Sequence, residues 1–120
     1  MSATLSIALQ NNLIETLNLF GNPESIAASA LRRYALDQCL QRIEQAKERI
    51  ARYEAKYHLP YQSFKQKTAT DATFLTELNQ NHPLWEVDAI EWAEYVEDVK
   101  LWRRRLEAIL QESRLLPASS

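Results

Sequence analysis

Two seams of apolar residues, each repeating at alternating spacings of three and four, constrain what this chain can fold into. The first seam comprises Leu36, Cys39, Ile43, Ala46, Ile50, Tyr53 and Tyr57. The second comprises Trp92, Tyr95, Val99, Trp102, Leu106 and Ile109. Heptad spacing places each set on one face of an α-helix that packs along its length. We therefore expect a mainly α fold with a helical hairpin, or two helices whose seams face other chains.

Proline and glycine indicate where the first long helix begins and ends. The chain has one Gly and four Pro in 120 residues, which favours long helices over turn-rich β architecture. Pro23 suits the first helical position, with Asn22 before it as N-cap. The helix should stop near Tyr57, because Pro60 disfavours helical conformation in the residue that precedes it.

The second long helix should run from about residue 84 to residue 113. The connector of residues 58–84 gives weaker signals. Its "LPYQSFKQ" segment is compatible with a helical turn that starts at Pro60, and the rest with a loop and a short helix.

The N-terminal segment "TLSIAL" alternates apolar and small residues, which predicts a half-buried strand over residues 4–9. A short helix with apolar residues at helical spacing should follow it and end at Gly21. One strand leaves its backbone groups unpaired, so we expect a second copy of the chain to pair with it. The core of this homodimer would contain Leu5, Ile7 and Leu9.

The parts "TLSIAL", "NNLIETLNLF", "GNPE" and "SIAASALRRYAL" together resemble the ribbon-helix-helix family. The resemblance implies one short strand plus two helices, an obligate dimer, and in many members DNA binding through the paired strands. It would place the outward strand residues on base edges and the start of the second helix on phosphate. The implied DNA-binding residues are Thr4, Ser6, Ala8, Asn22, Ser25, Arg32 and Arg33. The ribbon's outer face carries no charge, which is a poor match to DNA phosphates.

The stretch "RIEQAKERIARYEAKYHLPYQSFKQK", with the later "EWAEYVEDV", is similar to small prokaryotic proteins regarded as antitoxins. In that pattern a Gly is usual where this chain has His58. The resemblance implies that the C-terminal helices pack on a cognate toxin protein. Aromatic anchors and carboxylates would supply the contacts. The partner-binding candidates are Trp85, Glu91, Trp92 and Tyr95.

Charge is distributed unevenly along the chain. Residues 32–67 carry nine basic and four acidic side chains, whereas residues 68–98 carry eight acidic and no basic ones. Such asymmetry favours a charge-matched contact. The acidic helix could meet a basic partner, or it could pair with the basic helix of its own chain while its aromatic residues fill the hairpin core.

Residues that could support catalysis or metal binding do not cluster in the sequence. His58 and His82 stand beside prolines in connectors, and Cys39 lies on the heptad seam, where a small core residue is expected. A single Gly excludes a glycine-rich phosphate loop. We therefore expect a non-enzyme with no cofactor or metal. One Cys, no signal peptide and no membrane-spanning run indicate a cytoplasmic protein.

These observations divide the chain into residues 1–40 for dimerisation and possible DNA binding, residues 41–116 as a helical arm, and residues 117–120 as a tail. The expected function is that of an antitoxin-like protein that neutralises a toxin with its C-terminal helices and could bind operator DNA to regulate its own operon. The alternative is a coiled-coil dimerisation or adaptor protein without a nucleic-acid role.

Overall fold

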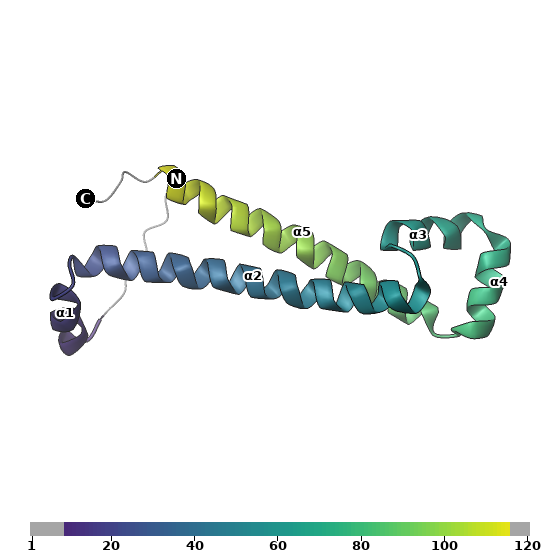
Figure 1. The fold of residues 1–120 in the computed structure, drawn as a ribbon, viewed down its shortest axis with the longest axis horizontal. Coiled ribbons are helices and arrows are strands. Elements are labelled where there is room, and N and C mark those ends of the chain that lie inside the picture. Colours follow the sequence, from purple (N-terminus) through teal and green to yellow (C-terminus); the bar gives the residue numbers. More distant parts are fainter. Residues whose placement is uncertain (1–8, 116–120) are drawn as a thin grey trace. The chain divides into compact units, whose positions relative to one another are not determined.

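The structure is a computed structural model that describes residues 9–115. These residues form five helices (Figure 1): α1 (Asn11–Asn18), α2 (Pro23–Tyr57), α3 (Tyr61–Thr70), α4 (Ala72–Asn81) and α5 (Trp85–Leu115). The chain divides into two compact units between Ala35 and Leu36, inside α2. None of the helices within residues 9–115 is long and apolar enough to cross a membrane.

The ribbon-helix-helix class expected for the N-terminal residues is wrong: residues 9–115 form helices and no strand. Leu9 precedes α1 and Gln10 is its N-cap residue. The alternating run has six residues, which are too few to establish a period of two, and no strand exists among the described residues. Most of that strand, including Leu5 and Ile7, lies outside the described residues. The mainly α part of the prediction is confirmed.

The first unit, as far as it is described, is α1 followed by the start of α2. Gly21 separates them with a φ of +149°, a backbone conformation that favours glycine. The Asn22 side chain then caps α2, accepting hydrogen bonds from the backbone N–H groups of Glu24 (2.9 Å) and Ser25 (3.2 Å). No residue from 9 to 35 is buried, and Phe20 is 79% exposed.

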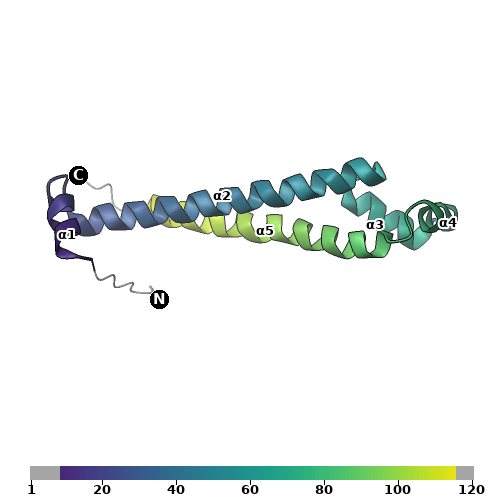
Figure 2. The same cartoon turned by 90° about the horizontal axis from the view of Figure 1, so that it is seen from below.

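The second unit is an antiparallel hairpin of α2 and α5, joined at one end by α3 and α4 (Figure 2). Arg42 of α2 contacts Trp102 of α5, whereas Tyr57 contacts Trp92, so the two helices run in opposite directions. Along α2 the buried seam residues are Cys39, Ile43, Ala46 and Tyr57. The heptad seam thus faces the core, as its spacing predicts.

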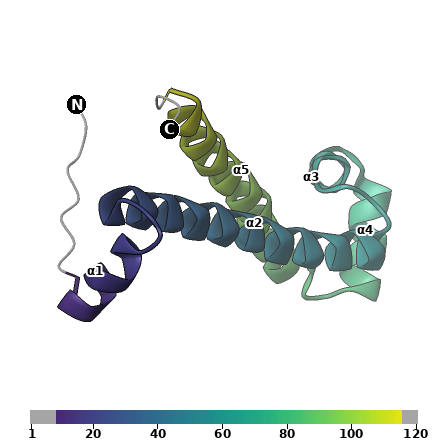
Figure 3. The ribbon, with the colours of Figure 1, turned by 60° about the vertical axis from the view of Figure 1, so that its left-hand side comes forward.

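α2 ends at Tyr57 because His58 adopts a φ of +60°, in the left-handed region. The residues after Pro60, which were expected to form one helical turn, a loop and a short helix, form two ten-residue helices, α3 and α4. Asp71 separates them and caps α4 by accepting a hydrogen bond of 3.0 Å from the Phe74 N–H. Figure 3 shows α3 and α4 again at the end of the hairpin where α2 leads into α3.

Trp92 of α5 is the centre of the core at this end. Its side chain is 0% exposed and packs with Tyr57 of α2, Phe64 of α3 and Leu78 of α4. Its ring centroid lies 5.1 Å from that of Phe64 and 5.4 Å from that of Tyr61. Each of α2 to α5 thus supplies a large side chain to one aromatic cluster, which fixes how these helices pack.

Candidate functional site

One surface of the second unit combines exposed apolar side chains with carboxylates. Val87 and Ile90 of α5 are 59% and 65% exposed, although α5 buries other apolar residues in the core. They line a shallow depression on α5, which we call the acidic surface; it consists of Val87, Ile90, Glu91, Glu94, Tyr95 and Asp98. Exposed apolar groups among like charges favour contact with a protein that supplies basic and apolar groups.

Glu91 and Tyr95, two of the residues predicted from the sequence to bind a partner, lie together on this surface. The Tyr95 hydroxyl donates a hydrogen bond of 3.1 Å to a Glu91 carboxylate oxygen. This bond raises the pKa of Tyr95, because ionising the phenol would place two negative charges side by side. Burial, and then the nearby Glu91 carboxylate, raise the pKa of Tyr53 to about 12. Glu91 therefore helps to fix the orientation of the Tyr95 side chain at the edge of the core.

The other two predicted partner-binding residues lie elsewhere. Trp92 is fully buried in the aromatic core, so it presents no surface to a partner. Its indole N–H meets no hydrogen-bond acceptor among the described residues. Trp85 is half-buried, and its indole N–H donates a 2.7 Å hydrogen bond to the side chain of Asn79. Both side chains thus hold α5 against its neighbours.

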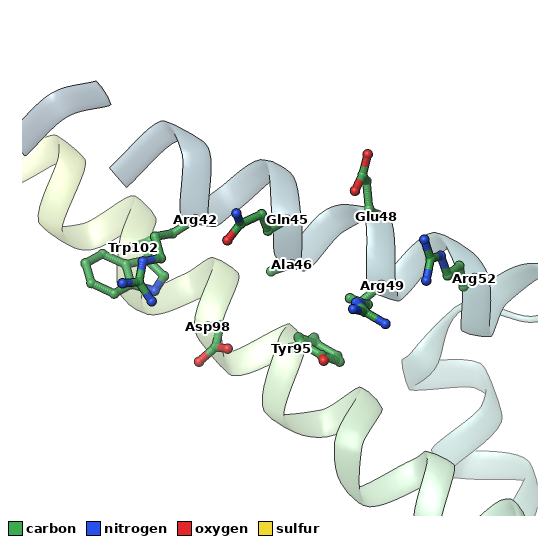
Figure 4. Close-up of a pocket in the computed structure, with 9 residues that line it drawn as sticks. All are labelled: Arg42, Gln45, Ala46, Glu48, Arg49, Arg52, Tyr95, Asp98 and Trp102. Carbon is green, nitrogen blue, oxygen red and sulfur yellow. The ribbon is translucent and has the colours of Figure 1, made fainter. Parts of the chain in front are cut away.

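A second depression, the arginine groove, lies between α2 and α5 (Figure 4). The guanidinium of Arg42 lies 5.4 Å from the centre of the Trp102 ring, a distance at which a cation is attracted by the aromatic face. In Figure 4 Arg49 points toward Tyr95, whereas Glu48 points away from α5. The residues that line the groove are Arg42, Gln45, Ala46, Glu48, Arg49, Arg52, Tyr95, Asp98 and Trp102.

The excess of basic residues in 32–67 was noted from the sequence, but the arginines of this groove were not singled out. Arg42, Arg49 and Arg52 are seven and three residues apart, so they follow the same side of the helix. That spacing was visible in the sequence. The spacing alone does not show that this side of α2 borders α5 and faces Tyr95, Asp98 and Trp102.

Among the described residues, few charges of α2 and α5 form ion pairs with each other. Within residues 9–115, the ion pair that joins the two helices is Lys56 with Asp88, at 2.6 Å. Arg42, Arg49 and Arg52 have no carboxylate within ion-pair distance in the described part of the chain. The sequence also allowed the acidic helix to pair with the basic helix of its own chain. Within residues 9–115 such an ion pair occurs at one position, between Lys56 and Asp88.

Lys56, Tyr57 and Asp88 form a polar contact at the end of the hairpin. The same Asp88 oxygen accepts hydrogen bonds from the Lys56 ammonium and from the Tyr57 hydroxyl (2.5 Å). Burial would raise the pKa of Asp88, but the two hydrogen bonds outweigh it and hold the pKa below its ordinary value. Burial, followed by the bond to Asp88, raises the pKa of Tyr57. This contact is suited to fastening α2 to α5.

The residues expected to bind DNA are not gathered into a site by the described structure. Thr4, Ser6 and Ala8 lie outside the described residues. Asn22 caps α2, and the Ser25 N–H is used by that cap. Arg32 is half-buried and Arg33 is exposed, both further along α2.

Residues that could bind a metal do not converge either. No group of three or more His, Cys, Asp or Glu side chains with metal-binding geometry occurs in the part of the chain that is described. Cys39 is a free, buried residue of the seam. His82 packs edge-on against the Tyr57 ring, with 5.1 Å between the ring centroids.

Comparison of the chain with protein-family models, with curated proteins and with solved structures found no match.

Proposed function

We propose that the chain is a non-enzymatic, antitoxin-like protein that binds and neutralises a basic toxin protein through the acidic surface of α5. The observation that carries this proposal is the exposure of Val87 and Ile90 among carboxylates. Both residues lie in the stretch from residue 68 to residue 98, which contains eight acidic and no basic side chains. The resemblance of residues 42–67 and 91–99 to small prokaryotic antitoxins, drawn from the sequence pattern alone, is in keeping with the same assignment.

The carboxylates and the apolar side chains of the acidic surface act at different stages of binding. Carboxylates attract a basic surface at long range and increase the rate of encounter, whereas apolar groups supply affinity once water is expelled. Glu94 and Asp98 have no cation within ion-pair distance among residues 9–115, so a partner can pair with them without breaking an existing ion pair. A nuclease that binds RNA phosphates has the complementary charge at its active site.

The test is co-expression with the product of the gene adjacent to the one that encodes this chain. Expressed alone in a bacterial host, that product should reduce the number of colony-forming units, and this chain should restore it. The variant Val87→Asp/Ile90→Asp should restore growth at least about tenfold less well, because a buried carboxylate without a partner opposes binding. Leu40→Asp is the matched control, since Leu40 is also exposed but lies on α2, outside the acidic surface.

Two results would contradict the proposal. One is a neighbouring product that is not toxic and does not bind the purified chain. The other is equal rescue by the wild type and by Val87→Asp/Ile90→Asp, at equal protein level and equal helix content by circular dichroism. Either would favour the adaptor protein as the function.

A further inference from the structure

The acidic surface and the arginine groove are two halves of one surface. Tyr95 and Asp98 line both depressions, so the two are continuous along α5. One half carries Val87, Ile90 and carboxylates. The other half carries three arginines and the half-buried Trp102 ring. A single surface of the second unit thus changes sign of charge along its length.

These opposite charges are not joined by ion pairs within residues 9–115. The arginines of the groove have no carboxylate within ion-pair distance in the described part of the chain, and the same is true of Glu94 and Asp98 for cations. A partner that brings acidic groups to one half and basic groups to the other could pair with both. Such a partner gains from each half without leaving like charges opposed.

Polyanions and basic proteins each match one half of this surface. A nucleic acid strand would be attracted by Arg42, Arg49 and Arg52 but repelled by Glu91, Glu94 and Asp98 beside them. A basic protein is attracted by the acidic half alone. A second copy of this chain carries both halves at the same separation, and a two-fold rotation places each half against its opposite.

We propose that two copies of the chain associate through this surface as a two-fold symmetric dimer, with the arginine groove of each copy against the acidic surface of the other. The two-fold axis passes near Tyr95, which belongs to both halves, so that Asp98 of each copy faces the arginine groove of the other. The α5 helices of the two copies then cross this axis in opposite directions. Val87 and Ile90 of each copy are covered by the aromatic end of the other groove, where the Arg42–Trp102 contact lies.

This dimer replaces the strand-mediated homodimer expected from the sequence, and it uses the second unit instead of the first residues. It does not rest on the toxin proposal, because the purified chain alone suffices to test it. Since a toxin and a second copy would both cover the acidic surface, binding of one displaces the other. The dimer would then shield Val87 and Ile90 while no toxin is bound.

The experiment is a charge-reversal exchange on the purified full chain. The all-acidic variant carries Arg42→Glu, Arg49→Glu and Arg52→Glu, and the all-basic variant carries Glu94→Arg and Asp98→Arg. In either variant alone the two halves have net charges of the same sign, so we expect the dimer dissociation constant to rise by about 100-fold or more. Mixed in equal amounts, the two variants should form a heterodimer, because every half then faces its opposite.

Light scattering coupled to size-exclusion chromatography and analytical ultracentrifugation measure the association. Arg103→Glu/Arg104→Glu/Arg105→Glu is the matched control: it reverses three exposed arginines of α5 outside the groove and should leave the dimer intact. Circular dichroism verifies that helix content is unchanged. If a charge-reversed variant unfolds, the neutral changes Arg49→Gln and Glu94→Gln replace it, and each should weaken the dimer by about tenfold.

The wild type should dimerise less tightly as ionic strength rises, because the pairs that hold it are solvent-accessible. The proposal is overturned if the wild-type chain is monomeric at about 100 μM at moderate salt. It is equally overturned if the all-acidic and all-basic variants remain dimeric, or if the two monomeric variants fail to associate when mixed. Any of these negative results would leave the growth-rescue assay unaffected, because that assay needs only the acidic surface.

Discussion

The Tyr57 hydroxyl donates a hydrogen bond of 2.5 Å to the Asp88 carboxylate and so joins the last residue of α2 to the first turn of α5. The Tyr57 ring is buried in the aromatic core, whereas its hydroxyl reaches the polar edge of that core. Lys56 pairs with the same Asp88 oxygen from the solvent side. One carboxylate thus satisfies a phenol and an ammonium group from consecutive residues.

Removing this carboxylate should destabilise the hairpin. We expect Asp88→Ala to lower the free energy of unfolding by about 1–3 kcal/mol, because it leaves the Tyr57 hydroxyl without its acceptor. The double variant Asp88→Ala/Tyr57→Phe should lose less than the sum of the two single variants. Urea unfolding followed by circular dichroism measures all three. Glu86→Ala, at an exposed acid of the same first turn, should stay within about 0.5 kcal/mol of the wild type.

Trp92 should be the most sensitive core position near the α3–α4 end. Trp92→Ala should cost about 3–5 kcal/mol, because it removes the ring that packs against α2, α3 and α4. Trp92→Phe should cost much less, since it keeps an aromatic ring and removes an N–H without an acceptor in the described structure. Thermal unfolding compares the two. A Trp92→Ala variant with near wild-type stability would show that the aromatic cluster is misassigned.

His58 offers a site for stabilisation. A residue with a side chain at φ +60° is strained, whereas glycine adopts that conformation readily. We expect His58→Gly to raise the free energy of unfolding by up to about 1 kcal/mol, and His58→Ala to give no gain. The two variants share the loss of the imidazole, so their difference isolates the backbone effect. Equal stabilities in urea would mean that residue 58 carries no strain.

Raising the pH should lower the free energy of unfolding of the second unit at pH values where the tyrosines of the folded chain are still protonated. The pKa of Tyr53 rises from 10.0 to about 12, so the folded chain retains a proton that the unfolded chain has lost. This contribution is fully present below pH 10 and is lost as pH rises from 10 toward 12. Unfolding midpoints in urea at increasing pH should fall over this interval. The fall should be shallower for Tyr53→Phe, and an unchanged slope would contradict the assignment.

The seams of apolar residues predicted the hairpin well because their signal is repeated along the helix. Cys39, Ile43 and Ala46 are buried as the spacing requires. α3 and α4 were harder to predict, since each has ten residues and one buried side chain, Phe64 or Leu78. Helices that short depend on tertiary contacts, which a local pattern does not contain.

The candidate site was predicted in part. Glu91 and Tyr95 were identified from the acidic, aromatic composition of their helix, and both lie on the acidic surface. Trp92 was placed on the partner surface by the same composition, although its position on the seam equally predicted the burial that the structure shows. The arginine groove could not be predicted from the sequence, because its position depends on which side of α2 borders α5. The short alternating run at the N-terminus misled the assignment of fold class because six residues are too few to establish a period.

The three tryptophans stand in three different environments, and this gives the chain built-in optical reporters. Trp92 is enclosed by other rings, so its emission should shift only when the hairpin melts. Trp102 lies beneath the Arg42 guanidinium at the edge of the groove, so its emission should respond to anything that settles there while the helices stay intact. A fluorescence titration can therefore distinguish docking from denaturation without an attached dye.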